Sequence, residues 1–370
     1  MHPARKSAIA ILALLYALLF AEAYLRVFGS RLFGDHGRSY VHRPWQDRLV
    51  RGVPFRTNGW GVRGEPFTAR SLRIVAFGGS ATESAEVPEA ESWPARVEWH
   101  LNGRFGARAG QVANAGSAGL SSPHYVAHVE ELARPIGLDV AILYTGLNDT
   151  DRLARYGRIL RVERIGDRSY REVFLQAFTA PDPVRLTDIG NPILERSYLV
   201  LFVRSFFEKS FVQPLRNRLE DLVPGWHLRD KRARLRASPV FGAVLARAKE
   251  DYTHNLTLMF DAARAAGVTP IFMSAPRMSG EPELMALNQA LVSFCRERGA
   301  PLIDLAAEAP PAGGWYGLGH HFTRQAADAT GAEIAAAIAD LLEGKRAGGE
   351  ELRRRARERG LTLATRGDVR

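Results

Sequence analysis

Four residues that lie far apart in the chain have the types that acyl-transfer chemistry requires. Ser80 ends an apolar run after two glycines, which predicts a buried strand that breaks sharply and presents a hydroxyl, although Gly-Gly-Ser alone is more often a plain turn. A serine needs a base to take its proton during attack, and His321 is the candidate. The oxyanion formed at an acyl carbon needs preorganised donors, which the N–H groups of Ser80 and Gly119 and the amide of Asn148 could supply.

Three further motifs surround these residues. They read Asn114-Ala-Gly-Ser-Ala-Gly119, Ile142-Leu-Tyr-Thr-Gly-Leu-Asn-Asp149 and His320-His-Phe-Thr323. Together with Gly-Gly-Ser, and in this order, they resemble the SGNH (GDSL-type) hydrolase family, in particular its bacterial membrane-anchored members. The resemblance covers roughly residues 55–340, and the Gly-Leu-Asn-Asp block is its most specific part.

The resemblance implies a fold, an activity and a set of site residues. The fold of the family is a three-layer α/β/α sandwich. Its activity is hydrolysis or transfer of acyl esters, often acetyl groups on carbohydrate, with no metal or organic cofactor. Its signature residues map onto Ser80 and His321 as catalytic residues and onto Ser80, Gly119 and Asn148 as the oxyanion hole, with Gly116 as the alternative glycine.

The chain departs from the family pattern in two places. Gly-Gly-Ser replaces Gly-Asp-Ser, which is a minor change. The carboxylate three residues before the histidine is missing, because Leu318 holds that place before His321 and Gly317 holds it before His320; the Phe-Thr that follows favours His321 as the base. A Ser-His dyad remains workable if another group fixes the imidazole tautomer. Asp304 is more often a cap or loop anchor at such a position and is left out of the site.

From residue 71 onward, strand-like apolar runs alternate with helical patterns. This alternation indicates parallel βαβ units and predicts a five-stranded parallel sheet of the flavodoxin-like type. The reactive crevice of such sheets lies beyond the carboxyl ends of the strands, so the motifs that follow the first three strands should meet at one edge. The expected strands are 74–77, 111–114, 140–144, 269–274 and 301–305, and the expected helices are 93–101, 125–133, 246–266, 283–298 and 331–342.

The hydrolase domain is expected over residues 71–345. Within it, an arginine-rich helical insertion or lid is expected at about 151–240, where the alternation stops. Residues 29–70 are predicted to be a linker and a packed lead-in containing Asn58-Gly-Trp-Gly-Val-Arg-Gly64, which is similar to lead-ins of membrane-anchored SGNH proteins. Residues 346–370 are a charged tail, for which a solvated face or a frayed helix is the default interpretation.

Residues 1–28 predict a membrane-targeting segment. Basic residues precede an apolar run over 8–21, and one helix over 8–28 would be long enough to span a bilayer. The basic residues favour a cytoplasmic N-terminus, with a single-pass anchor in the inner membrane and the catalytic domain in the periplasm. The alternative is a cleaved signal peptide, because Ala21-Glu-Ala23 has the spacing of a cleavage site.

Composition narrows the class of protein. One cysteine in 370 residues excludes a disulfide scaffold, and Cys295, in a helical pattern, is expected to be a buried thiol. The chain has 50 Lys plus Arg and 40 Asp plus Glu, a net charge of +10 that could attract anionic partners, but it carries no nucleic-acid motif. No nucleic-acid partner is therefore expected, and the sequence does not fix the oligomeric state.

The sequence thus predicts a membrane-anchored, extracytoplasmic serine esterase of SGNH type that removes acyl groups, acetyl among them, from a cell-envelope glycan or lipid. An O-acyltransferase is the first alternative, because transfer and hydrolysis share an acyl-enzyme and differ in whether a sugar hydroxyl or water attacks it. A non-catalytic glycan-binding or assembly protein is the second, because the acid is missing.

Overall fold

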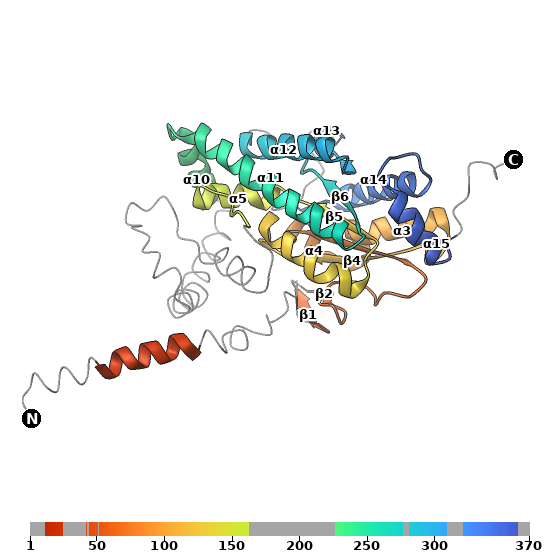
Figure 1. The fold of residues 1–370 in the computed structure, drawn as a ribbon, viewed down its shortest axis with the longest axis horizontal. Coiled ribbons are helices and arrows are strands. Elements are labelled where there is room, and N and C mark those ends of the chain that lie inside the picture. Colours follow the sequence, from red (N-terminus) through yellow and green to blue (C-terminus); the bar gives the residue numbers. More distant parts are fainter. Residues whose placement is uncertain are drawn as a thin grey trace, which may run out of the picture. The chain divides into compact units, whose positions relative to one another are not determined.

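The computed structural model describes residues 12–24, 42, 44–50, 52–162, 226–276, 281–308 and 321–361. The chain divides into two compact units. One comprises Met1–Arg38, Ala154–Gly157 and Tyr170–Ser238, and its described part includes a helix over 12–24 and α10 (Trp226–Ala237). The other comprises Ser39–Leu153, Arg158–Ser169 and Pro239–Arg370 and holds the central sheet (Figure 1).

Two predicted segments fall only partly within the described residues. The membrane helix was expected over 8–28, and the structure describes a helix over 12–24. In the described part of the chain, no helix is both long enough and apolar enough to cross a membrane. Of the insertion expected at 151–240, the structure describes the end of α5 (Leu147–Tyr156) and the whole of α10, whereas 163–225 lie outside the described residues.

Five parallel strands form the sheet, in the order β4-β3-β5-β6-β7. Every residue of β5 and of β6 is buried, as expected for strands that are covered on both faces. The predicted five-stranded parallel sheet is therefore confirmed. The strands are β3 (Leu72–Gly78), β4 (Gly110–Gly116), β5 (Val140–Tyr144), β6 (Thr269–Met273) and β7 (Leu302–Ile303).

Helices cover both faces of this sheet. On one face, α3 (Trp93–Phe105) and α14 (Arg324–Leu342) pack together over a core that includes Ile74 and Ile142. On the other, α4 (Ser122–Ile136), α11 (Phe241–Ala265) and α12 (Pro282–Arg298) lie side by side (Figure 1), and Phe272 of β6 meets Phe294 of α12 edge to face. Successive strand residues point to opposite faces. The three-layer α/β/α sandwich that the resemblance implies is thus confirmed.

Two segments outside the sheet differ from the sequence-based expectation. The lead-in contains an antiparallel hairpin of β1 (Asp47–Val50) and β2 (Val53–Arg56), which was not predicted. Residues 350–361 were expected to be part of a solvated or frayed tail. Instead, α15 (Glu350–Glu358) packs on the domain and buries Leu352 completely, so that this part of the tail belongs to the core. The remaining short helices are η1 (Glu89–Glu91) and α13 (Leu305–Glu308).

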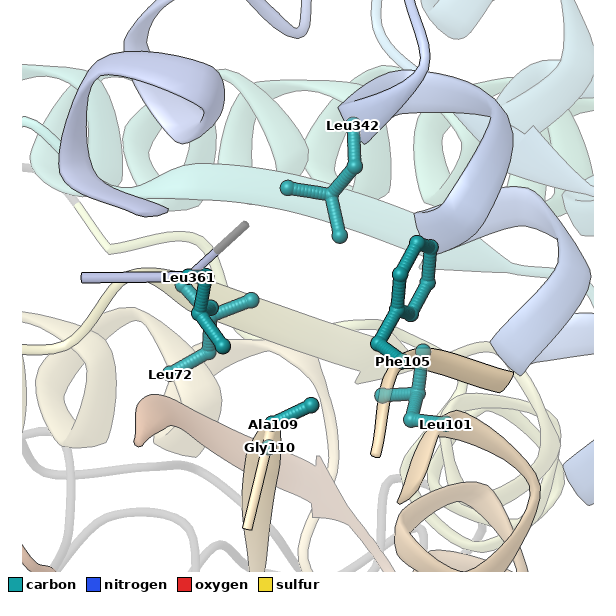
Figure 2. Close-up of a pocket in the computed structure, with 7 residues that line it drawn as sticks. All are labelled: Leu72, Leu101, Phe105, Ala109, Gly110, Leu342 and Leu361. Carbon is teal, nitrogen blue, oxygen red and sulfur yellow. The ribbon is translucent and has the colours of Figure 1, made fainter. Parts of the chain in front are cut away.

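A small apolar cavity lies at the amino ends of β3 and β4. Its volume is about 10 Å³, and it is lined by Leu72, Leu101, Phe105, Ala109, Gly110, Leu342 and Leu361 (Figure 2). Such a volume holds one water molecule at most. Because Ser80 follows the opposite end of β3, this cavity is not the place where a substrate would meet that residue.

Cys295 on α12 is a buried free thiol, as predicted. Its burial raises the pKa of the thiol to about 12. A thiol that stays protonated at neutral pH is a poor nucleophile, so Cys295 is a packing residue.

Candidate active site

Ser80 begins a one-turn helix directly beyond the carboxyl end of β3. This helix, α2 (Ser80–Glu83), follows Gly79, whose backbone is extended. A Cβ built on Gly79 would lie 2.0 Å from Nδ2 of Asn148, so the amide of Asn148 lies directly against the residue that precedes Ser80. Only glycine permits this approach. The Ser80 side chain is half-buried and has no hydrogen-bond partner among the described residues.

The turn that follows β4 leaves one N–H group uncommitted. Ser117 N–H donates to Gly78 O at 3.1 Å, and Leu120 N–H donates to Ser117 O at 3.2 Å. Ala118 N–H donates to the carboxylate of Glu83 at 2.9 Å.

Gly119 is the exception in this turn, because its N–H has no hydrogen-bond partner in the described part of the chain. Its φ of +77° is left-handed, and a Cβ there would meet nothing within 4 Å. Gly119 therefore exposes a donor to open space, as an oxyanion hole requires.

Gly116, the alternative glycine, has a structural role instead. Its N–H donates to Asn114 Oδ1 at 2.8 Å, and its carbonyl lies 2.9 Å from His42 Nε2. A Cβ on Gly116 would lie 2.1 Å from the backbone nitrogen of Glu83. Since both polar groups of Gly116 are committed, Gly119 is the better candidate donor.

Asn148 joins the two turns from the first turn of α5. Its Nδ2 donates to Leu120 O at 2.6 Å, and because an amide nitrogen carries two hydrogens, a second donor remains. The neighbouring Asp149 is fully buried and accepts hydrogen bonds from Ser122 Oγ at 2.6 Å and from Gly146 N–H at 3.3 Å. Burial raises the pKa of Asp149. Asp149 thus holds the loop in place, as the sequence suggested.

His321 is held at the same edge of the sheet by the two residues that follow it. Phe322 packs against Tyr144, the last residue of β5, with 5.8 Å between ring centroids. Thr323 caps α14 by accepting a hydrogen bond from Ala326 N–H at 3.2 Å. His321 is half-buried. The residues weighed against it or against its missing acid, Gly317, Leu318 and His320, lie outside the described residues, and the pairing of Ser80 with His321 stays a prediction.

Asp304 acts as a loop anchor, in agreement with leaving it out of the site. Its Oδ1 accepts a hydrogen bond from Ser274 Oγ at 2.8 Å, and Ser274 Oγ in turn accepts one from Ala306 N–H at 3.0 Å. These bonds order the start of α13. No three His, Cys, Asp or Glu side chains in the described ranges are grouped to hold a metal ion.

No family model and no curated protein matches the chain. Among solved structures it is similar to a GDSL-like lipase from Bacteroides thetaiotaomicron, with 12% identity, 74% of this chain and 90% of that chain covered, and a TM-score of 0.39. It is also similar to the lipase/acylhydrolase from Enterococcus faecalis (15% identity, 72% and 95%, TM-score 0.40) and to the acetyl xylan esterase AlAXEase (10% identity, 72% and 100%, TM-score 0.40).

The chain has the sheet and the motif order of the SGNH hydrolases. Because the likeness to the solved structures is distant, the activity is argued from the residues of this chain.

Sequence reasoning missed two residues that hold the turn around Gly119. Glu83 was expected only to start a helix, yet its carboxylate binds Ala118 N–H, and burial raises its pKa. Arg152 Nη2 donates to Gly119 O at 3.1 Å. One signal was present, because Arg152 follows Asn148 by four residues and so shares its helix face.

Proposed function

We propose that the chain is an ester hydrolase in which Ser80 attacks the acyl carbon. The observation that carries this proposal is the uncommitted N–H of Gly119, in a turn joined by the Asn148 amide to the backbone beside Ser80. The Ser80 N–H lies at the first position of α2, where an N–H has no partner within the helix. Three donors thus converge without any need to break existing bonds, which favours a developing oxyanion.

The reaction proceeds through an acyl-enzyme. As Ser80 Oγ bonds to the acyl carbon, His321 takes the hydroxyl proton. The bond to the alcohol then breaks, and His321 returns the proton to the departing alkoxide. Water next bonds to the acyl carbon and gives a proton to His321, after which the ester bond to Ser80 breaks and Oγ regains the proton.

The substrate in this proposal is an acyl ester, acetyl esters included, on a glycan or lipid of the cell envelope. The resemblance to SGNH hydrolases supports this class. The enzyme is placed outside the cytoplasm and held by its N-terminal segment, and the apolar run over 8–28 with its preceding basic residues supports this location. A C-terminal reporter that is active only outside the cytoplasm tests the orientation, and the intact mass tests cleavage after Ala23.

Turnover of p-nitrophenyl acetate and butyrate by the purified full chain tests the activity. We expect Ser80→Ala to abolish turnover and His321→Ala to lower kcat by about 10²- to 10⁴-fold, because each removes a group that acts at the reacting atoms. His100→Ala is the control, since His100 contacts Asp328 on α14 and lies outside the site. Wild-type protein that neither turns over these esters nor reacts with a fluorophosphonate at Ser80 would exclude the hydrolase. Transfer of acetyl from a donor to a glycan, in place of release of acetate, would favour the acyltransferase.

A further inference from the structure

The lead-in before the sheet reaches the back of the turn that carries Ser80. Arg63, the arginine of the lead-in motif, pairs with Asn114 of β4: its N–H donates to Asn114 O at 2.9 Å, and its carbonyl accepts from Asn114 N–H at 2.8 Å. The Arg63 side chain is completely buried, with the guanidinium carbon 4.8 Å from the centre of the Phe55 ring. The sequence showed this motif as a glycine-rich lead-in, and the site described above makes no use of it.

The Arg63 guanidinium binds the carbonyl groups at the carboxyl end of α2. Nη1 donates to Glu83 O at 2.5 Å and to Ser84 O at 2.9 Å, and Nη2 donates to Val87 O at 3.4 Å. Asn114 Nδ2 adds a hydrogen bond to Thr82 O at 2.6 Å. A helix of one turn cannot satisfy its own last carbonyl groups. These two side chains therefore supply the partners that α2 lacks.

Ser84 connects this arrangement to the candidate nucleophile. Its N–H donates to Ser80 O at 2.9 Å, and its φ of +48° is left-handed, which is uncommon for a residue other than glycine. The N–H and hydroxyl of Ser80 lie at the opposite end of the same turn. A shift of the bound carbonyls would therefore tilt both groups of Ser80.

We propose that Arg63 is a positioning residue that holds α2 so that the hydroxyl and N–H of Ser80 face the donors of Gly119 and Asn148. The inference rests on the proposed function, because it concerns the reactivity of Ser80. A buried guanidinium is costly and persists where its hydrogen bonds are well made. The carboxylates of Glu89 and Glu83 partly offset the burial that lowers the pKa of Arg63.

Fluorophosphonate labelling of the full chain separates positioning from folding. The final extent of Ser80 labelling counts folded protein, whereas the second-order rate constant reports the reactivity of Ser80. We expect Arg63→Lys to lower the rate constant about 10- to 100-fold at nearly full extent, because displacement of reacting groups by about 1 Å has effects of this size. Lysine keeps the charge but loses the planar set of donors.

Arg73→Lys is the matched control. Arg73 Nη1 also donates to a backbone carbonyl, Ile136 O at 2.5 Å, but Arg73 lies near the amino end of β3, away from Ser80. We expect its rate constant to stay within about twofold of wild type, even if the extent falls. An Arg63→Lys protein that labels at the wild-type rate would overturn the inference.

If Arg63→Lys does not fold, Phe55→Leu replaces it, because this change keeps the guanidinium and removes the ring beneath it. A reduction of about threefold or more in the rate constant is then expected, and an unchanged rate constant overturns the inference. Wild-type protein that is not labelled at all counts against the proposed function and not against the role of Arg63.

Discussion

The polar groups around Ser80 are divided into those that hold the backbone and those that remain available. Glu83, Arg152 and Asn148 each bind a backbone group of the turn over 117–120. The N–H of Gly119 is left over, and the groups that fix it are themselves buried or bonded. Donors fixed in this way need no reorganisation when charge develops on a substrate. The rigidity of the turn, as well as its residue types, would therefore contribute to catalysis.

The two glycines of this turn should respond differently to alanine. Gly119→Ala should fold, because the added methyl group meets open space, with a loss of about 1–2 kcal/mol from the left-handed backbone. Its ester hydrolysis should fall about tenfold or more, since relief of that strain moves the donor. Gly116→Ala should instead lose most of its folded protein, because the new Cβ would meet the backbone of Glu83. Melting temperature and kcat are measured for both. Equal stability of the two variants would contradict this assignment.

At the scale of the elements, the sheet could be predicted and the parts that lock it could not. Val140–Tyr144 is uniformly apolar, and its strand has the predicted bounds. By contrast, α15 reads as a run of charges with only Leu352 and Ala356 apolar, so its burial depends on partners elsewhere in the chain. The role of Arg63 was equally hidden, because its acceptors are backbone carbonyls about twenty residues away. The motif order revealed the site, but long-range hydrogen bonds shape it.

The contact of α15 with the domain gives a prediction for the whole element. Arg359, which follows α15, forms an ion pair with Asp139 at 2.6 Å, and Asp139 is fully buried. Arg359→Ala should lower the free energy of unfolding by about 2 kcal/mol, because it leaves a buried carboxylate with less compensation. Arg354→Ala, on the exposed side of the same helix beside Glu351 and Glu358, should change it by less than about 0.5 kcal/mol. Urea unfolding of both variants tests this difference. Equal losses would mean that α15 is held by its apolar contacts alone.

Across the whole molecule, buried histidines couple the fold to pH. Burial lowers the pKa of His42 to about 4 and of His128 to about 3, and it holds the pKa of His124 well below its usual value. The unfolded chain therefore binds protons first as the pH falls below about 6.5, and stability is lost between that value and the folded-state pKa values. Asp149 and Glu83 act in the opposite sense, because burial raises their pKa values.

Since these contributions overlap in the wild type, a single substitution must isolate one of them. His128 on α4 is 1% exposed, and its ring nitrogens have no hydrogen-bond partner among the described residues. His128→Leu removes one site that takes up a proton on unfolding. Between pH 7.5 and pH 5.0 its free energy of unfolding should therefore fall by about 2 kcal/mol less than that of the wild type, as measured by urea unfolding. If His100→Leu, at the partly exposed contact with Asp328, flattened the profile equally, the effect could not be assigned to burial.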